Sequence, residues 1–430
     1  ENVGEPPAPS NSLKPITTTN HGDRNKKKKK DRKNCSWVEH EVEIHPGSYA
    51  HPDQQALFGV RLEEEVEKDI GDTSKRKICM LLGYLGDEYS GFQINPGVKT
   101  LQAEVELALY QIGAMDGRNF GRPTKYSWST SGRTDKGVHA AAQVVSLKAE
   151  FPKNDVEDDN TAATSVMDDF RNRLNEALPV DIRVLDVNRA TSRFHAKTSR
   201  SYVRYRYMVP SFCLMESMPV HDDEDAVDQL DNITPLLQDF RVSPDLLTKF
   251  RETLTKYEGT KPYHNFTRGK NHKDPSAKRI IRSFQAEDPV IHAPSGTEWI
   301  PTTVVGQSFL TYQIRKMIAY AIRTTVENNN DFDQAFLSES TPISTAPAQG
   351  LFLDMSFYDT YNERKERTNS LVPDLDWTNE ESESFQRWKD MKDCIVKHIM
   401  DEEHQSMNFV KFSCEQQRGF THNNVEQQPK

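Results

Sequence analysis

One stretch of this sequence combines residue types that could do chemistry, and it runs from Ser131 to Ala140. A carboxylate, Asp135, lies between two cations, Arg133 and Lys136, in a turn that also contains two glycines. Glycines permit a tight turn and let a ligand approach the backbone closely. The apolar segment that follows predicts a strand that would hold the turn rigidly. This pattern fits an active-site loop, and it fits a charged surface hairpin equally well.

Composition limits the classes of protein to which the chain can belong. With 430 residues it is long enough for two or three domains. Charged residues make up 28% and hydrophobic residues 35%, so we expect disordered segments around a folded middle. The net charge of −10 argues against a uniformly basic nucleic-acid-binding protein but permits a local basic groove.

Cysteine spacing and hydropathy exclude further classes. The five cysteines lie far apart without a CxxC pair, which is typical of a reducing compartment without structural disulfides. Cys35 and the histidines that follow it match no zinc-ligand spacing, so we expect no metal. No apolar run approaches the roughly 20 residues of a membrane span, so we expect no membrane association.

Residues 1–74 are predicted to form a largely disordered N-terminal extension. Within it, residues 24–33 hold eight cations in ten positions, and such a block repels itself. The run is typical of a nuclear localisation signal, although a loose RNA-binding arm or a solvated tail would look the same. We therefore predict a nuclear protein, with the mitochondrion as the alternative. Because the sequence begins at Glu1, whether a targeting segment precedes it stays open.

The middle of the chain reads as two similar halves, residues 75–190 and 191–362. Hydrophobic periodicity predicts the following elements of the first half: strands at 78–84, 140–148 and 182–185, and helices at 101–112 and 168–178. In the second half it predicts strands at 202–209, 279–286, 299–305 and 350–355, and helices at 244–258 and 309–326. An acidic insertion at about 215–232 interrupts the second half, and residues 363–430 form an acidic, partly helical C-terminal extension, with a helix expected at 381–403. We predict an α+β protein with a cleft between the halves.

Arg315 lies beside the apolar stripe of the helix predicted at 309–326. An arginine is rarely buried without a partner, because an unpaired buried charge is very costly. Asp135 is a candidate partner if this helix faces the cleft. The alternative is an arginine whose head group reaches the surface.

The strand at 202–209 alternates Tyr205 and Tyr207 on one face with Arg204 and Arg206 on the other. Aromatic rings and guanidinium groups on one platform are what stacking on nucleobases requires. An aromatic core face with a solvated basic face would give the same pattern. Other cations gather in the second half and could line a phosphate-binding groove or simply be solvated: His195, Lys197, Arg268, Lys270, His272, Lys273, Lys278 and Arg279.

Together these stretches resemble the TruA family of pseudouridine synthases, especially its eukaryotic branch that modifies tRNA. The resemblance runs from about residue 77 to about residue 362, and its strongest motif is GRTDKGVHA at 132–140. The supporting motifs occur in the family's order: YSGFQ at 89–93, FHA at 194–196, YRY at 205–207, YHNF at 263–266, QIRKM at 313–317 and PAQGLFL at 347–353. The family fold implies two α+β halves with antiparallel or mixed sheets joined across a central basic cleft, and helices on the outer faces.

The resemblance implies a role for each matching residue. Asp135 would be the catalytic nucleophile, and Arg315 would form an ion pair with it. Tyr205 would stack on the uracil, and Leu353 would form an apolar wall of the pocket. Arg133 would help turn the target base out.

The motifs also imply substrate contacts by Lys136, His139 and His195. The sequence departs from the bacterial pattern at several positions, which puts substrate choice in doubt more than chemistry: Lys197, Val203, Thr311, Tyr312 and Ala319.

The resemblance predicts a tRNA pseudouridine synthase, an isomerase that would need no cofactor because the reaction transfers no electrons or groups to another molecule. Its partner would be tRNA, with other structured RNA such as snRNA or mRNA left open, and we favour a monomer. A different class of function, an RNA-binding or RNA-chaperone protein on the same fold, is the alternative. A zinc nucleobase deaminase is excluded because it needs a CxxC pair.

Overall fold

A computed structural model of the chain describes residues 73–95, 97–153, 160–218, 230–327, 332–368 and 370–425. Predictions for the basic run at 24–33 and for most of the acidic insertion lie outside these residues. Among the helices of the described segments, none has the length and hydrophobicity needed to cross a bilayer.

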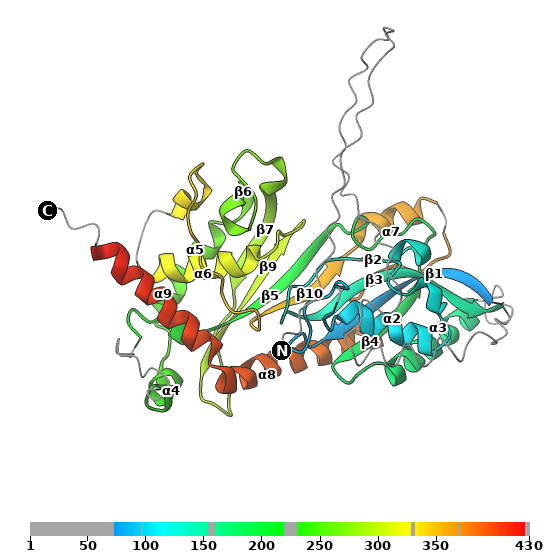
Figure 1. Cartoon of the computed structure of the whole chain (residues 1–430), viewed down its shortest axis with the longest axis horizontal. Helices are drawn as coiled ribbons and strands as arrows, with labels where there is room; N and C mark the ends of the chain where they lie inside the picture. Colours follow the sequence, from blue (N-terminus) through cyan, green and yellow to red (C-terminus); the bar gives the residue numbers. More distant parts are fainter. Residues whose placement is uncertain are drawn as a thin grey trace, which may run out of the picture. The chain divides into compact units, whose positions relative to one another are not determined.

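The fold is built on one ten-stranded sheet, in which eight strands follow the order β4-β1-β3-β10-β5-β9-β7-β6 (Figure 1). The strands are β1 (Thr73–Tyr84), β2 (Ser129–Thr130), β3 (His139–Pro152), β4 (Ile182–Arg189), β5 (Tyr202–Pro210), β6 (Gly259–Pro262), β7 (Lys278–Ala286), β8 (Val290–Ile291), β9 (Glu298–Gly306) and β10 (Leu351–Phe357). Two short strands pair beside this path, β2 with β3 and β8 with β9. All pairs are antiparallel except β10 with β3, where the last strand joins the strands of the first half to those of the second.

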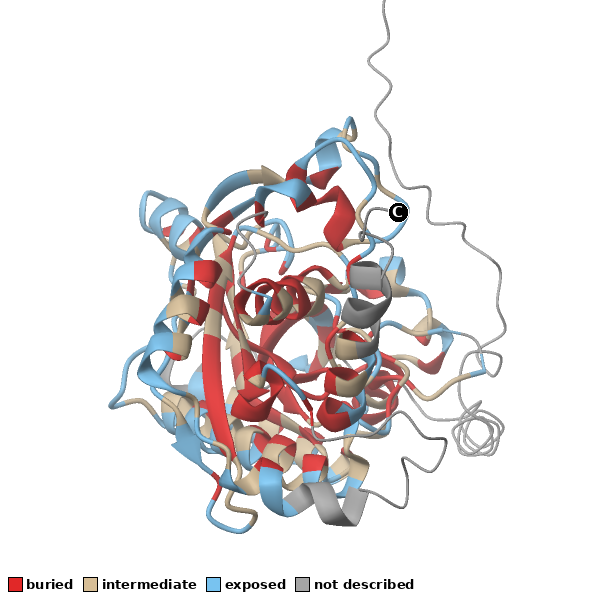
Figure 2. Cartoon of the chain, turned by 90° about the vertical axis from the view of Figure 1, so that its left-hand side faces the viewer, coloured by how far each residue is buried: buried red, intermediate tan, exposed pale blue. Residues whose placement is uncertain are grey.

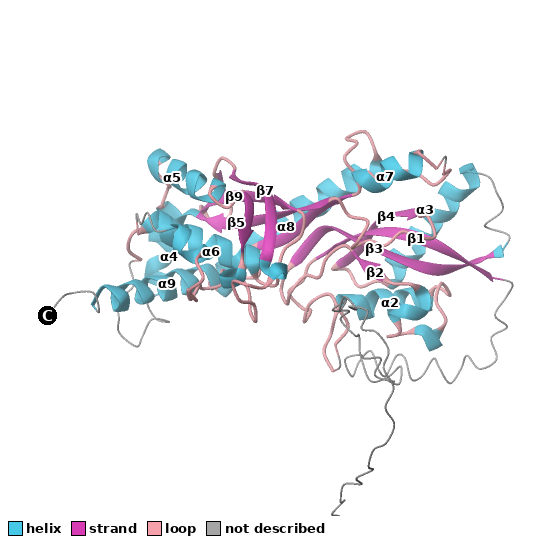
Figure 3. Cartoon of the chain, turned by 90° about the horizontal axis from the view of Figure 1, so that it is seen from above, coloured by secondary structure: helices cyan, strands magenta, loops and turns pink. Residues whose placement is uncertain are grey.

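Helices surround this sheet, as the view from above shows (Figure 3). They are α2 (Leu101–Gln111), α3 (Asn160–Ala177), α4 (Leu230–Asp239), α5 (Pro244–Thr255), α6 (Gln313–Val326), α7 (Asp359–Glu366), α8 (Glu383–Ser406) and α9 (Asn408–Val425). Of these helices, α3, α5 and α8 pack directly on the strands of the sheet. A mixed sheet with helices packed on it agrees with the predicted α+β class. The similarity of the two halves and the basic cleft stay predictions.

The core lies along the central strands. Ile78 to Leu82 on β1 are fully buried, and most of β3 beside them is buried too. Strands covered on both faces read as continuous apolar runs, which is why the sequence predicted both strands correctly. Figure 2 shows the buried residues gathered on the sheet and on helices that pack against it.

Helix α6 begins later than predicted, at Gln313 instead of residue 309. The residue before it, Tyr312, has a left-handed backbone with φ of 63°. A residue in that conformation cannot belong to a right-handed helix, so the helix cannot extend through it toward residue 309. The side chain of Gln313 turns back and accepts a hydrogen bond from the Leu310 N–H at 2.8 Å.

The C-terminal extension packs on the sheet, which its sequence did not reveal. Helix α8 lies against β1, β3 and β4. Arg387 donates from Nε to the Leu185 carbonyl at 2.6 Å, and Trp388 donates from Nε1 to the Asp354 carbonyl at 2.9 Å. The predicted helix at 381–403 is therefore confirmed, and it closes one face of the sheet.

Candidate active site

The predicted site residues of the two halves meet in one row across the sheet. Leu353 on β10 pairs with Ala140 on β3 at one side and with Tyr205 on β5 at the other. Directly paired residues point to the same face of a sheet. The end of the Asp135 loop, the predicted apolar wall and the predicted stacking tyrosine are therefore neighbours on one face.

The backbone of the loop touches this row at Gly132. A Cβ atom added there would lie 3.2 Å from the Tyr205 hydroxyl oxygen and 3.6 Å from the Leu353 Cδ1. The contact with the tyrosine is tight enough that a side chain at this position would press on its hydroxyl, while the contact with the leucine is ordinary van der Waals contact. Glycine at 132 therefore lets the loop lie directly against the tyrosine and the leucine.

Strand β3 holds the start of the loop through a buried glutamine. The Ser131 N–H donates to the Val144 carbonyl at 2.7 Å, and the Ser131 hydroxyl donates to Gln143 Oε1 at 2.5 Å. Gln143 donates from Nε2 to the Gly132 carbonyl at 2.7 Å, and its side chain is fully buried. Sequence analysis missed Gln143, because a polar residue inside an apolar run carries no sign of its partner.

The turn after β1 holds the other side of the loop. The Phe92 N–H donates to the Thr134 carbonyl at 3.1 Å, and the Tyr84 and Thr134 hydroxyls are hydrogen-bonded at 2.8 Å. Gly91 has φ of +99°, and a Cβ atom there would lie 3.1 Å from the Thr134 carbonyl oxygen. The YSGFQ motif was recognised from the sequence, but its role as a support for the loop is visible only in the structure.

Asp135 is partly buried, and the pKa of its carboxyl group is raised. Burial is the largest cause, while the charge of Arg315 and the backbone N–H of Tyr312 act in the opposite direction. The ion pair that the resemblance implies would lower the pKa of Asp135. Arg315 does lower it, but the cost of burying a charge outweighs that contribution.

The predicted ion pair between Asp135 and Arg315 is not formed as a direct contact. Among the described residues, no nitrogen of Arg315 lies within 4.0 Å of the Asp135 carboxylate oxygens. Arg315 instead donates from Nε to the Ala346 carbonyl at 2.6 Å, and its guanidinium carbon lies 5.7 Å from the Tyr312 ring centre. Its charge acts on Asp135 at longer range, so the prediction of a close pair needs this correction.

Tyr205 is 8% exposed, and burial raises the pKa of its hydroxyl to about 12. Its ring meets the ring of Phe309 edge-on, with 5.4 Å between the centres. Arg200 lies beside it and donates to the Ser131 carbonyl and, at 3.1 Å, to the Gln307 carbonyl. Arg200 therefore ties the loop of the first half to the second half, a role that its place in the sequence did not reveal.

Of the other residues predicted to contact the substrate, three have exposed side chains and one is buried. Arg133 and Lys136 are exposed and can meet a ligand. His195 is also exposed, on the segment between β4 and β5, where the Ala196 N–H donates to the Ser129 hydroxyl at 2.9 Å. Their roles in binding stay predictions.

His139 does not fit the predicted role in substrate binding, because its side chain is fully buried. It pairs with Phe352, one position before the Leu353 row, so it points to the opposite face of the sheet. Its Nδ1 accepts a hydrogen bond from the Gly86 N–H at 3.1 Å, and burial lowers its pKa to about 4. The residue holds the turn at Gly86 in place.

His139 also belongs to a cluster that has the chemistry of a metal site. One ligand atom from each of Asp87, His139 and His398 lies within 4.8 Å of the others. The Nε2 of His398 is hydrogen-bonded to the Asp87 carboxylate at 2.7 Å, and the Nδ1 of His139 accepts from Gly86. An ion would have to compete with these bonds, and no observation on the described residues favours one.

Comparison with known proteins supports the resemblance. A family model described as tRNA pseudouridine synthase matches residues 254–359, which include Arg315 and Leu353. A mouse protein named pseudouridylate synthase 1 homolog is 31% identical over 383 residues, which cover 88% of this chain and 78% of the mouse protein. This chain belongs to the TruA family of pseudouridine synthases.

Fungal members of the pseudouridine synthase family are similar as well. A Saccharomyces cerevisiae protein named tRNA pseudouridine(27/28) synthase is 29% identical over 77% of this chain and 97% of its own length. A Yarrowia lipolytica protein named tRNA pseudouridine synthase 1 is 30% identical over 67% of this chain. The chain spans 65% of the length of the Yarrowia protein, just under two thirds.

Proposed function

We propose that this chain isomerises uridine to pseudouridine in tRNA, with Asp135 as the nucleophile. The observation that carries the proposal is the row formed by the Asp135 loop, Leu353 and Tyr205 across the sheet. The loop that carries this partly buried carboxylate lies against Tyr205 and Leu353 at Gly132, and the charge of Arg315 acts on Asp135. A uracil nucleotide needs these groups for stacking, for enclosure and for reaction at its sugar.

The target base must first leave its helix, because its sugar cannot be reached inside the stack. Unstacking costs a few kcal/mol and needs a wedge and a new stacking surface. Arg133 is exposed two residues before Asp135 and would fill the place of the base. Tyr205 would stack on the extruded uracil, and Leu353 would close the pocket beside it.

The reaction exchanges one bond at the ribose for another. The ionised carboxylate of Asp135 would attack C1′ as the bond from C1′ to N1 breaks, and the freed uracil would turn so that C5 faces C1′. When the bond from C5 to C1′ forms, the carboxylate leaves, C5 loses its proton and N1 gains one. An alternative within the same site has the carboxylate act as a base at the sugar. The atoms and electrons balance within the substrate, so no cofactor is proposed.

Several finer statements belong to the same proposal. The two halves would flank a basic cleft that binds the phosphates of tRNA, and other structured RNAs such as snRNA or mRNA could enter the same cleft. We propose that the protein acts as a monomer in the nucleus, where the basic run at 24–33 would direct it, with the mitochondrion as the alternative location.

The test replaces Asp135 with Asn, which keeps the size of the side chain and removes the charge. We expect a loss of turnover of at least about a thousandfold, as for other catalytic residues that act as a unit, with tRNA affinity kept. Asp116→Asn is the matched control, because that carboxylate pairs with Arg118 at the surface of the first half. Single-turnover conversion of uridine in tRNA and a separate binding assay would measure both quantities.

Two results would contradict the proposal. A folded Asp135→Asn protein with wild-type turnover would remove Asp135 from the chemistry. A wild-type protein that binds tRNA tightly but forms no pseudouridine in a single turnover would favour the RNA-binding or RNA-chaperone function.

A further inference from the structure

The start of α6 holds a residue whose backbone is strained beside the proposed site. Of the described residues other than glycine, three have positive φ: Ser127, Tyr312 and Met407. Tyr312 alone among these three acts on Asp135, through its backbone N–H. A strained residue persists only where its surroundings hold it, and such residues concentrate at functional sites.

The ring of Tyr312 contacts two guanidinium groups. The guanidinium carbon of Arg268 lies 5.0 Å from the ring centre, and that of Arg315 lies 5.7 Å from it. Both distances are within the range at which a cation is attracted to the face of an aromatic ring. One ring therefore orients two cations from different segments of the chain.

The two cations differ in their other contacts. Arg315 is partly buried, donates to Ala346 and acts on the Asp135 carboxylate. Arg268 is exposed, and among the described residues its N–H groups donate to no protein acceptor. Its donors are thus free for a ligand, and a planar fork of N–H groups suits a phosphate.

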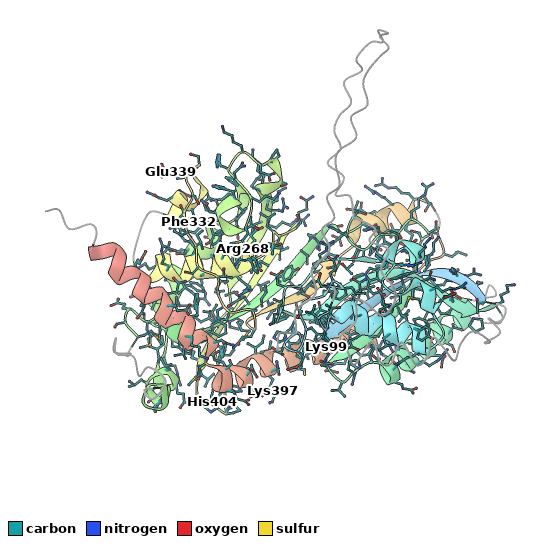
Figure 4. All side chains as sticks on the ribbon, viewed as in Figure 1. Lys99, Arg268, Phe332, Glu339, Lys397 and His404 are labelled. Carbon is teal, nitrogen blue, oxygen red and sulfur yellow. The ribbon has the colours of Figure 1, made fainter. Side chains whose placement is uncertain are left out.

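Arg268 lies on the segment between β6 and β7, where Figure 4 labels it. This segment is fastened to the start of α6: the Thr267 hydroxyl donates to the Thr311 carbonyl at 3.0 Å, and Lys316 donates from Nζ to the Asn265 carbonyl at 3.3 Å. Two further cations follow on the same segment, the exposed Lys273 and Lys270, which pairs with Asp274, and the exposed Lys278 begins β7. The segment therefore presents positive charge while it stays attached to the helix that carries Arg315.

We propose that Tyr312 is a positioning residue that stacks Arg268 and Arg315, so that a phosphate of the RNA bound by Arg268 is aligned with the carboxylate of Asp135. The inference rests on the proposed function and adds a specific substrate contact to it. Tyr312 is one of the positions at which this sequence departs from the bacterial pattern. An aromatic ring at this position can hold both guanidinium groups.

The test compares substitutions of Tyr312 and Arg268 in the full chain with a tRNA substrate. Tyr312→Leu removes the ring, and Tyr312→Phe keeps it. Arg268→Ala removes the phosphate contact alone. Arg282→Ala is the matched control, because Arg282 stacks at 4.2 Å on Tyr202, whose side chain points to the other face of the sheet.

We expect Arg268→Ala to raise KM about fivefold with little change in kcat, and to lower the slope of log affinity against log salt by about one. Tyr312→Leu should raise KM by a similar factor and also lower kcat, while Tyr312→Phe should behave like the wild type. Once Tyr312 is Leu, the additional Arg268→Ala change should have little further effect, since the two residues act as a unit. Arg282→Ala should change neither constant.

Three results would overturn the proposal: Tyr312→Phe as damaging as Tyr312→Leu, effects of Tyr312 and Arg268 that simply add, or unchanged salt dependence in Arg268→Ala. If Tyr312→Leu fails to fold, Tyr312→Phe and Arg268→Ala still decide between these results. The binding and salt measurements do not require turnover. They therefore separate a failure of this inference from a failure of the proposed reaction.

Discussion

Two segments meet at Asp135, and they are held in different ways. The loop at 131–138 is fixed by hydrogen bonds from both sides, through buried Gln143 and through Tyr84. The segment at 307–315, which carries Arg315, receives hydrogen bonds at the Gln307 and Thr311 carbonyls, and it adds a left-handed residue, Tyr312, whose ring lies against Arg268 and Arg315. Hydrogen bonds fix a direction sharply, whereas stacking on a ring face tolerates sliding.

This difference suggests a division of tasks between the two segments. The loop keeps the carboxylate in one place, as a nucleophile requires, because small errors in position are costly to a reaction. The segment at 307–315 brings a cation that acts at longer range and that can adjust when RNA binds. Damage to the loop should therefore affect turnover and stability together, while damage to the segment should affect affinity and pH dependence.

The largest expected effect comes from removing the anchor of the loop. Gln143→Leu leaves the Ser131 hydroxyl without an acceptor for its proton and the Gly132 carbonyl without a donor, so we expect a loss of about 2–3 kcal/mol in the free energy of unfolding. Turnover of the folded protein should fall as well, because the loop would move. Denaturant titration and kcat would measure the two effects.

Gln102→Leu is the control for this prediction. Gln102 is also buried, but it donates to Glu106, away from the loop. The Gln102→Leu change should destabilise the protein without lowering the kcat of the molecules that remain folded. If both variants lose stability and neither loses turnover, the loop does not need its anchor.

A smaller effect, on pH dependence, is expected from Arg315→Met. The reaction needs an ionised Asp135, so activity is present above the pKa of that carboxyl group and is lost as the pH falls through it. Arg315 lowers that pKa, so its removal should move the acid limb of kcat/KM to higher pH. Burial, the backbone of Tyr312 and the nearby hydroxyl of Tyr205 remain and act as before.

A pH profile of kcat/KM would measure this shift. Arg323→Met is the control, because Arg323 lies on the same helix and pairs with Glu327. Its acid limb should stay in place. An acid limb that moves to lower pH in Arg315→Met would contradict the sign of the interaction.

The smallest effect is expected from the hydrogen bond between Tyr84 and Thr134, which supports the loop from β1. Tyr84→Phe removes one hydrogen bond to Thr134, which should cost about 1 kcal/mol and lower kcat only a few-fold. Tyr126→Phe removes a buried hydroxyl that donates to Glu106 elsewhere and should leave kcat unchanged. Thermal unfolding and kcat of the two variants would show whether loss of this hydrogen bond disturbs the loop that carries Asp135. Equal kcat values in the two variants would mean that it does not.

Much of the fold could be predicted from local patterns. The strands β5, β7, β9 and β10 and the helices α2, α5 and α8 were predicted close to their observed bounds, while β1 and β3 are longer than predicted. The apolar periodicity of these elements reflects which face is buried, and this periodicity can be read from residues that are close together in the sequence. Helix α9 was not predicted.

The errors at the site share one cause. His139 lies inside the strongest motif, yet its side chain points to the opposite face of the sheet from Leu353. The direct contact expected between Arg315 and Asp135 is replaced by a hydrogen bond to Ala346. Both depend on side-chain direction and on distances between segments, and a motif contains neither.

The sequence by itself determined the residue types that the chemistry needs and, through ordered motifs, the family. Only the tertiary structure decided how they meet. The parallel pairing of β10 with β3 sets Leu353 between Ala140 and Tyr205. Burial then raises the pKa of Asp135 against the charge of Arg315. Register and desolvation arise from contacts between distant segments, so no local pattern can encode them.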